Sequence, residues 1–232
     1  MVWYQILISI ALAYLLGSFQ TSYIFGKLVK KVDIRNYGSG NPGATNAIRV
    51  FGAKFGMVVL VIDALKGALS ILIPRLLFGP MDVAIELLVG IFAIVGHNYP
   101  FYMGFKGGKG VAASIGIILA VDWRAFLIAG IPALLLLLIT RIMSVASLSF
   151  EFLSFLSFFI IYFTDKNLFW IVVTAALYPL MSFYRHRKNI INLLEGKEKK
   201  LWGKGSEKIT VETKDKNASE NEAAKSKTAK DA

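Results

Sequence analysis

The chain has 232 residues, 56% of them hydrophobic, and its mean hydropathy of +0.59 is higher than soluble globular domains usually show. The absence of cysteine excludes disulfides, thiolate nucleophiles and cysteine-bound zinc, and two histidines argue against a multi-histidine metal site. The formal net charge is +11, but the charges lie between apolar runs, which does not favour nucleic acid as a partner. We therefore expect an integral membrane protein without a metal or organic cofactor.

Long apolar runs alternate with short polar segments along the chain. A membrane-spanning helix needs about 20 mostly apolar residues, so the short run at 110–121 stands out. We expect that run either to begin inside the preceding glycine-rich loop or to be a partial span packed against protein. The pattern predicts an all-α polytopic membrane protein with about seven transmembrane helices, at 2–26, 56–74, 84–99, 110–121, 125–140, 145–163 and 168–184.

The distribution of lysine and arginine predicts the orientation. The first run has no positive charge before it and is followed by Lys27, Lys30 and Lys31, which is typical of an uncleaved span with its N-terminus outside. Seven spans then place the C-terminus in the cytoplasm. The predicted inside segments hold fifteen lysines and arginines against three outside, as the positive-inside rule requires. These segments are 27–54, 97–110, 141–144 and 185–202 inside, and 75–83, 122–124 and 164–167 outside.

The chain divides into a membrane domain, residues 1–202, and a tail, residues 203–232. The tail consists mainly of lysine, glutamate, alanine, serine and asparagine, and Ile209 and Val211 are its only large aliphatic residues. Such a segment cannot bury enough apolar surface to fold. It is predicted to be a disordered, charged cytoplasmic tail.

The first polar motif, GSGNPGATN at 38–46, is followed by Arg49. Its glycines, proline and small polar residues exclude a plain helix and offer backbone N–H groups, hydroxyls and amides beside a guanidinium. Those groups are typical of an oxyanion or phosphate site, although a flexible cytoplasmic loop is the alternative. The candidate ligand-binding residues are Ser39, Gly40, Asn41, Gly43, Thr45, Asn46 and Arg49.

The second motif, GHNYPFYMGFKGGKG at 96–110, surrounds Lys109 with glycines, so that backbone can approach an anion closely. It is not a Walker A loop, because Met103 and Gly110 stand where that pattern needs glycine and serine or threonine. A helix starting near Gly110 would point its positive end at the same anion. The alternative is a hinge with interfacial lysines. The candidate residues are Lys106, Gly107, Gly108, Lys109 and Gly110.

The third motif begins after the last apolar run. His186 and Asn189 are three residues apart, so one helical face would carry both toward a ligand with several oxygens. Arg185, Arg187 and Lys188 are interpreted as a cytoplasmic stop signal.

Four charged residues fall inside the apolar runs. Asp63 and Lys66 are spaced to pair with each other, and a functional role is weighed equally with that pairing. Glu86 and Glu151 lie near opposite ends of their runs, where we expect them to reach water. Ser144, in the short basic turn after the fifth run, carries no assignment by itself.

Three predicted inside segments supply anion-binding groups, which favours a phosphorylated ligand at the cytoplasmic interface. A serine–histidine–aspartate arrangement is not recognisable. The His-x4-Asp pattern of many glycerolipid acyltransferases is also absent, because Tyr102 and Ile191 stand where the aspartate would be.

Together these segments resemble the bacterial acyl-phosphate-dependent glycerol-3-phosphate acyltransferases of the PlsY type. The resemblance rests on GSGNPGATNAIR at 38–49, GHNYPFYMGFKGGKGVAAS at 96–114 and HRKNIINLLEGKE at 186–198, with IDALKG at 62–67 and SVAS at 144–147. It covers roughly residues 5–202. Where this chain has VAAS and SVAS, the family often has VAT and SLGS.

The resemblance implies transfer of a fatty acyl group from acyl phosphate to the 1-hydroxyl of glycerol 3-phosphate, and we hypothesise direct attack without an acyl-enzyme. The products would be lysophosphatidic acid and phosphate, in the first step of phospholipid synthesis at a bacterial cytoplasmic membrane. Membrane lipid and the enzyme that makes acyl phosphate would be further partners.

The resemblance also assigns roles to residues. Gly107–Gly110 and the Asn41–Asn46 loop would hold the acyl phosphate head. Either the substrate's own phosphate or, less favoured, His186 would accept the hydroxyl proton. Glycerol 3-phosphate would be held by Ser39, Arg49, Lys109, Ser144, His186 and Asn189.

Two other functions remain open at this point. A transporter for a phosphorylated small molecule would use similar loops, but no inverted repeat is visible and Lys66 is the only basic residue deep in a run. A structural anchor would explain the basic clusters by their attraction to anionic lipid, but not the two glycine-rich motifs.

Overall fold

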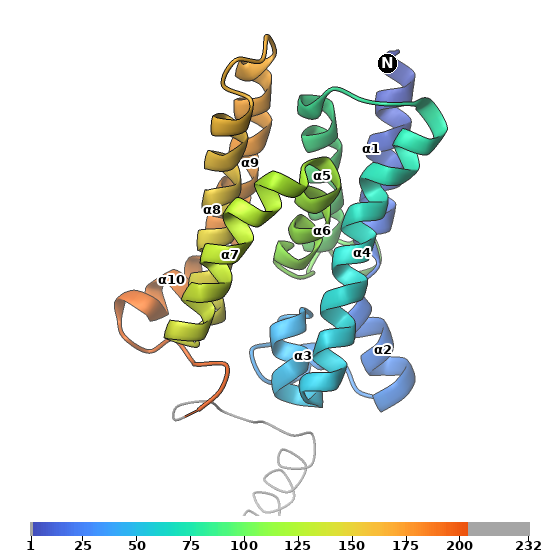
Figure 1. Ribbon diagram of the computed structural model, residues 1–232. Coiled ribbons are helices and arrows are strands. Elements are labelled where there is room, and N and C mark those ends of the chain that lie inside the picture. Colours follow the sequence, from blue (N-terminus) through green and yellow to red (C-terminus); the bar gives the residue numbers. More distant parts are fainter. Residues whose placement is uncertain (1, 204–232) are drawn as a thin grey trace, which may run out of the picture.

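The computed structural model describes residues 2–203 and contains helices joined by loops, with no strand in that range (Figure 1). The predicted tail, except for Gly203, lies outside the described residues. The helices are α1 Trp3–Ser18, α2 Thr21–Lys30, η1 Ile34–Asn36, α3 Ala44–Phe51, α4 Ala53–Phe78, α5 Val83–Asn98, η2 Phe101–Met103, α6 Val111–Val121, α7 Trp123–Thr140, α8 Met143–Ile161, α9 Leu168–Arg185 and α10 Arg187–Leu194.

The all-helical membrane architecture predicted from the sequence is confirmed. Among the described residues, 6 helical segments are long and apolar enough to cross a bilayer: Trp3–Lys30, Ala53–Phe78, Val83–Met103, Trp123–Thr140, Met143–Ile161 and Leu168–Arg185. The short run forms α6, whose 11 residues rise about 16 Å, roughly half of the hydrocarbon core. The seven apolar runs thus become six long segments and one short helix.

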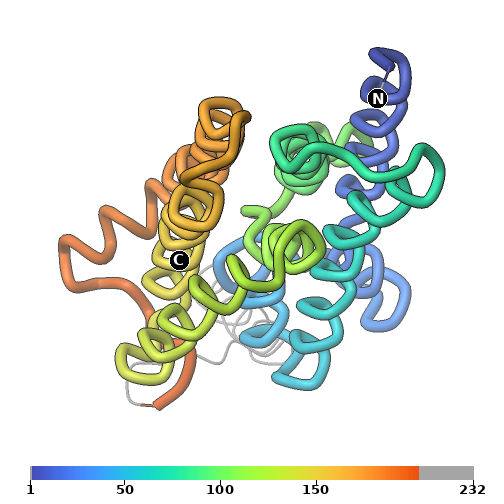
Figure 2. Tube along the Cα trace, turned by 45° about the horizontal axis from the view of Figure 1, so that its top comes forward, coloured from blue at the N-terminus to red at the C-terminus, as the bar shows by residue number. Residues whose placement is uncertain are grey.

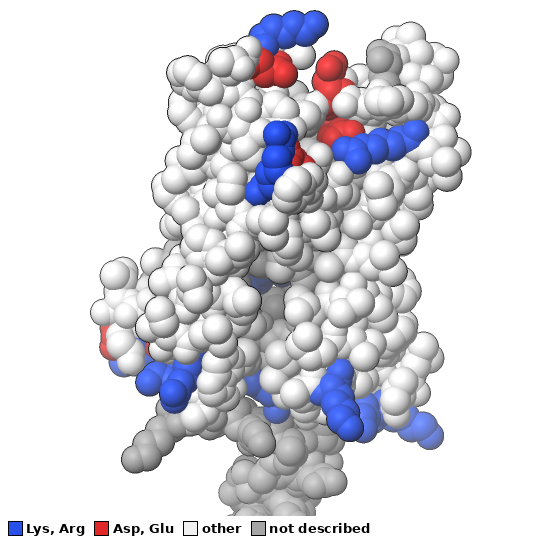
Figure 3. Space-filling view, viewed as in Figure 1, with Lys and Arg blue, Asp and Glu red and all other residues white. Residues whose placement is uncertain are grey.

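The helices form two groups that lie side by side (Figure 2). One contains α1, α4, α5 and α6, and the other contains α7, α8 and α9, with contacts of α9 on α5 and of α7 and α8 on α6 between them. The face shown in Figure 3 is mostly uncharged between its two ends; basic and acidic side chains lie together at the upper end, and mainly lysine and arginine lie at the lower end. The surface is also hollowed between the two groups, with basic atoms visible inside.

Small residues allow the helices of the first group to pack closely. A Cβ atom on Gly17 would overlap the Ala93 backbone, where α1 meets α5. Added Cβ atoms on Gly67 and Gly116 would overlap the backbone of Ala113 and Ala64, where α4 meets α6. Such close backbone approach is the usual way for helices to associate in a membrane, where apolar surface alone gives little driving force.

The charged residues inside the apolar runs are buried. Asp63 and Lys66 pair as predicted, with 2.8 Å between Oδ1 and Nζ. The expectation that Glu86 and Glu151 reach water is wrong, because each is 2% exposed. Glu86 is paired with Arg75, whereas Oε2 of Glu151 has no hydrogen-bond partner among the described residues.

The α5–α6 connection, which contains the second motif, lies about midway along the bundle (Figure 1). Non-helical backbone at membrane depth is tolerated only where it is buried in protein or lines a polar cavity. Gly107, Gly108 and Gly110 are accordingly buried. The partial span considered from the sequence therefore becomes a short helix that starts inside the protein, with the glycine-rich loop at its N-terminal end.

Candidate active site

The first motif forms a tight loop braced by Asn46. The Asn46 side chain is 1% exposed, its Oδ1 accepts the Ser39 N–H at 2.9 Å and its Nδ2 donates to the Tyr37 carbonyl at 3.0 Å. Gly38 has φ +58° in this loop, and a Cβ there would overlap Oδ1 of Asn46. Both ends of the amide therefore hold the loop, which is a different role from the ligand contact expected for Asn46.

The other candidates of this motif lie in the loop or in the first turns of α3. The N–H groups of Gly40 and Gly43 donate to the carbonyls of Tyr37 and Asn41. Gly43 caps α3, and Thr45 lies in its first turn, where backbone N–H groups have no partner within the helix. The groups of this motif that could bind an anion are thus the backbone N–H groups in the first turn of α3, and not those of Gly40 and Gly43.

Ser39 and Arg49 bring the first motif to the third. Together with Gly38 they line a cavity of about 230 Å³, whose opposite wall is formed by Asn189, Asn192, Glu198 and Lys199. Arg49 also donates to the Lys199 carbonyl at 3.3 Å. Residues about 150 positions apart in the sequence therefore share one cavity.

The glycine-rich loop is held from two sides by its backbone. The N–H groups of Gly107 and Gly108 donate to the carbonyls of Asn98 and His97, each at 3.0 Å. From α9, Arg185 donates to the Gly107 and Gly108 carbonyls at 3.0 and 2.6 Å. The two glycine N–H groups thus donate to α5 and not to a ligand, although the sequence suggested that this backbone approaches an anion. Arg185, interpreted from the sequence as a stop signal, has a structural role in this loop.

Gly110 ends the loop at φ +91° and caps α6, so a helix does begin there as predicted. The N-terminal end of this helix carries partial positive charge from its first backbone N–H groups. Lys109 immediately precedes it. The loop therefore places one ammonium group beside one helix N-terminus, which is a favourable environment for an anion.

Lys109, Asn189 and Ser144 are brought together around Glu198. Lys109 Nζ donates to Asn189 Oδ1 at 2.5 Å, and Asn189 Nδ2 donates to Glu198 Oε1 at 2.7 Å. Ser144 Oγ donates to the same carboxylate oxygen at 2.8 Å. Lys106, in contrast, is exposed and joins none of these hydrogen bonds.

Glu198 was not among the residues predicted to bind ligand, although it lies in the third motif. Its carboxylate receives the hydroxyl and amide donors that were assigned to glycerol 3-phosphate. Asn192 adds a fourth polar group, 3.3 Å from Oε2. These charge-assisted hydrogen bonds fix the positions of Ser144, Asn189 and Asn192 around the Glu198 carboxylate.

His186 lies at the junction of α9 and α10, so His186 and Asn189 do not share one continuous helical face as predicted. Its Nδ1 lies 2.9 Å from the Ser182 carbonyl, which can only accept, so Nδ1 carries the proton and Nε2 has the lone pair. Burial and the Lys109 charge lower the pKa of His186 to about 4. His186 is therefore neutral near pH 7 and does not line the cavity.

Burial also lowers the pKa of Lys109, to about 8, because the charged form loses hydration. Nearby Arg185 and Arg49 lower it further, whereas Glu198 raises it. An anion bound beside Lys109 would favour the ammonium form. The electrostatics of the site therefore favour a negatively charged ligand.

Asn98 was missed by the sequence interpretation. Its side chain is fully buried and neither amide atom has a hydrogen-bond partner among the described residues. Its Oδ1 would lie 3.2 Å from a Cβ on Gly110, which places it at the start of α6. The second motif contains Asn98, but only the fold shows that its side chain is buried against the loop.

The three motifs thus converge on one region, and comparisons with known proteins identify its family. A family model described as glycerol-3-phosphate acyltransferase matches residues 7–196. The chain belongs to the glycerol-3-phosphate acyltransferase family. It is 43% identical over 196 residues to the glycerol-3-phosphate acyltransferase of Lactiplantibacillus plantarum, covering 84% of this chain and 91% of the relative. The Aquifex aeolicus acyltransferase is 41% identical over 186 residues, covering 80% and 94%.

Two solved structures of PlsY (YgiH), an integral membrane glycerol 3-phosphate acyltransferase, share this fold. The glycerol 3-phosphate form has a TM-score of 0.76 and 37% identity, covering 85% of this chain and 96% of that chain. The lysophosphatidic acid form has a TM-score of 0.73 and 35% identity, covering 84% and 94%. The family named from the three motifs is confirmed, and this acyltransferase is an enzyme rather than the transporter or anchor considered from the sequence.

Proposed function

We propose that this acyltransferase moves a fatty acyl group from acyl phosphate to the 1-hydroxyl of glycerol 3-phosphate, giving lysophosphatidic acid and phosphate. The observation that carries the proposal is the convergence of Ser39, Arg49 and Asn189 on one cavity, with Lys109 bonded to Asn189. A solved structure of the same family is described as the glycerol 3-phosphate form, which supports this ligand.

The proposed setting is a bacterial cytoplasmic membrane, with the site facing the cytoplasm. The excess of lysine and arginine in the segments that carry the motifs supports this orientation. Acyl phosphate is amphiphilic, so it would arrive through the membrane surface, delivered by the enzyme that produces it. The hollow between the two helix groups (Figure 3) offers a lateral route for its chain.

The donor is proposed from its chemistry. Acyl phosphate is a mixed anhydride whose leaving group is already an anion, so attack by the glycerol hydroxyl needs no enzyme nucleophile. The bond from the hydroxyl oxygen to the acyl carbon forms, and the bond from that carbon to the phosphate oxygen breaks. Positioning and electrostatic stabilisation by Lys109, Arg49 and the N-terminus of α6 would supply the catalysis.

The hydroxyl proton needs an acceptor, and we assign it to the phosphate of glycerol 3-phosphate itself. His186 is neutral and has a lone pair on Nε2, which would suit a base, but it lies buried outside the cavity lining. Its hydrogen bond to the Ser182 carbonyl instead fixes the junction of α9 and α10. In this mechanism His186 has a structural role at the junction of α9 and α10, and the substrate supplies its own base.

The test is a donor comparison with the purified protein in detergent. Palmitoyl phosphate and glycerol 3-phosphate should give phosphate and lysophosphatidic acid in equal amounts, whereas palmitoyl-CoA should give none. Turnover with palmitoyl-CoA but not palmitoyl phosphate, in folded protein, would refute the proposed donor. Turnover with neither would refute the proposed function.

The pKa of Lys109 predicts a pH limit. The pH dependence of kcat/KM reports the pKa values of the enzyme without bound substrate. In that form Lys109 loses its proton as the pH rises through about 8. Above that pH the bound anion loses its counter-charge, so kcat/KM for palmitoyl phosphate should fall about 10-fold per pH unit. The measurement is a profile of kcat/KM against pH from 6.5 to 9.5.

Lys109→Arg, which stays charged, is the control. It should lower activity at all pH values, but its kcat/KM should not fall above pH 8 as the wild type does. If the fall persists in that variant, it belongs to another group.

The unpartnered amide of Asn98 predicts that one substitution can lower activity without lowering stability. A buried polar group without a partner costs about 1–3 kcal/mol, so Asn98→Leu should leave the Tm unchanged or raise it. If the amide meets the substrate at the start of α6, the same variant should lower kcat/KM by at least about 10-fold. Ser22→Ala is the control, since Ser22 Oγ is also buried without a partner but lies on α2. Full activity in Asn98→Leu would show that the amide has no part in the reaction.

A further inference from the structure

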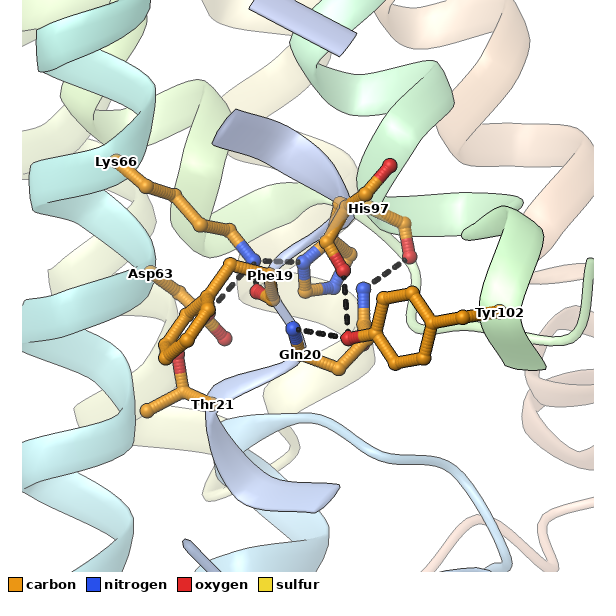
Figure 4. Close-up of polar contacts among 8 residues, drawn as sticks. Phe19, Gln20, Thr21, Asp63, Lys66, His97 and Tyr102 are labelled. Atoms are coloured by element: carbon orange, nitrogen blue, oxygen red, sulfur yellow. Dashed lines mark hydrogen bonds and ion pairs between the residues drawn. The ribbon is translucent and has the colours of Figure 1, made fainter. Parts of the chain in front are cut away.

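A buried polar cluster joins the first three long helical segments next to the glycine-rich loop (Figure 4). At its centre, Lys66 Nζ lies 2.8 Å from Asp63 Oδ1, 2.5 Å from the Phe19 carbonyl and 2.8 Å from His97 Nδ1. These partners come from α4, from the break between α1 and α2, and from α5. A lysine ammonium has three protons, and here each has one acceptor.

This arrangement sets the protonation of His97. Because the ammonium can only donate, Nδ1 of His97 accepts, and the neutral ring carries its proton on Nε2. The ring plane is thereby fixed by a group on another helix. His97 is 3% exposed, so the surrounding protein leaves the ring little room to turn.

His97 contacts the glycine-rich loop through both its backbone and its ring. Its carbonyl accepts the Gly108 N–H at 3.0 Å and the Gln20 side-chain amide at 2.7 Å. The ring lies directly against Gly108, where an added Cβ would overlap Nε2. The position of Gly108, and of Lys109 after it, therefore depends on how His97 is held.

Neighbouring groups complete the cluster without adding a second carboxylate. Thr21 Oγ1 donates to Asp63 Oδ1 at 2.7 Å. The Tyr102 hydroxyl donates to the Ser18 carbonyl at 2.9 Å and accepts the Gln20 N–H at 3.0 Å. Backbone groups freed where α1 ends are thus paired inside the protein, as the membrane interior requires.

A charged pair in this environment is costly, and apolar side chains would hold helices together at least as well. Apolar side chains could not, however, orient the His97 imidazole, and through that ring they could not position the Gly107–Gly110 loop. We propose that the Asp63–Lys66–His97 chain is a positioning device that holds the Gly107–Gly110 loop in its ligand-binding form, with His97 acting through Gly108 rather than on the substrate. The role assigned to the loop, binding the acyl phosphate head, rests on the proposed function.

Lys66→Met tests the proposal, with Glu86→Gln as a matched control. The Arg75–Glu86 pair also joins α4 and α5 and is also buried at its carboxylate, but its third contact is the Ala120 carbonyl at the far end of α6. Both variants should lower the Tm. Only Lys66→Met should speed hydrogen exchange at the Gly107 and Gly108 amides, measured by mass spectrometry on the full-length protein in detergent.

The kinetic expectation is equally specific. In Lys66→Met the KM for palmitoyl phosphate should rise about 10-fold and kcat should fall, because small displacements of a binding loop are costly. The KM for glycerol 3-phosphate should change less than about 2-fold, since the Ser39–Arg49 wall of the cavity is braced independently by Asn46. Glu86→Gln should change neither KM by more than about 2-fold.

Three results would overturn the proposal: unchanged loop exchange in Lys66→Met, the same exchange and kinetic pattern in Glu86→Gln, or an equal rise in both KM values. If Lys66→Met does not fold, the double variant Asp63→Asn, Lys66→Met leaves no unpaired buried charge and takes its place, with the same expectations. If the wild type does not use palmitoyl phosphate, the proposed donor fails, while the exchange comparison still decides the positioning role.

Discussion

Lys109→Met is expected to lower kcat/KM by about 10³-fold while the protein remains folded. The ammonium lies beside the N-terminus of α6, bonds Asn189 and is one residue from the backbone clamp formed by Arg185. Loss of a positioned charge in a partly desolvated site typically costs about 10²–10³ in rate. Methionine keeps the length and apolar stem of the side chain. The measurement is initial rates of lysophosphatidic acid formation with both substrates varied.

Lys106→Met is the comparison, because it removes the same charge three residues earlier in the same loop. Lys106 is exposed and joins none of the hydrogen bonds of the site. Its loss should therefore lower kcat/KM less than about 5-fold, through weaker long-range electrostatic attraction of the anionic substrates alone. Equal losses in the two variants would show that the loop contributes only net positive charge. In that case the assignment of Lys109 to a specific anion would be wrong.

The spans and the Asp63–Lys66 pair were predictable because they depend on local spacing. An apolar run of sufficient length must be helical in a membrane, and charges three residues apart on a helix can reach each other. The start of α6 at Gly110 was predictable for the same reason, since a glycine-rich loop followed by an apolar run indicates a helix N-terminus. These features need no knowledge of how the helices pack.

The detailed roles of Asn46 and Glu198 could not be predicted, because they depend on contacts between distant segments. Asn46 is in a motif rich in anion-binding residue types, and only the fold shows that both ends of its amide brace the loop. Glu198 meets Ser144 across 54 residues of chain. A carboxylate also argues against an anion site when residue types alone are considered, yet Glu198 accepts from Ser144 and Asn189, two of the residues predicted to bind the ligand.

The glycines of the second motif illustrate a related limit. Glycine indicates that the backbone must come close to something, but the residue type cannot say to what. The sequence suggested an anion, whereas Gly107 and Gly108 approach α5 and give their N–H groups to it. We propose instead that Lys109 and the N-terminus of α6 meet the anion. In that proposal the glycines serve the ligand indirectly, because they allow α6 to start inside the protein.

Gly108→Ala is accordingly expected to lower turnover by about 10²-fold or more and also to lower the Tm. A Cβ on Gly108 would overlap the His97 ring, which cannot move aside because Lys66 and the surrounding protein hold it. The loop must shift instead, and a displacement of about 1 Å at a catalytic group can cost 10²-fold in rate. Overpacking of this kind also costs about 1–3 kcal/mol of stability. Thermal unfolding and initial rates measure the two effects.

Gly104→Ala provides the control within the same loop. Gly104 has φ +63° but nothing within 4 Å of an added Cβ, so alanine there is strained without meeting any neighbour. It should lower the free energy of unfolding by about 1 kcal/mol, with a matching fall in the Tm, and leave kcat/KM nearly unchanged. If both variants lose activity in proportion to stability, the loop is merely a weak point of the fold. If only Gly108→Ala loses turnover, the result supports the proposal that the close contact between Gly108 and His97 sets the position of Lys109.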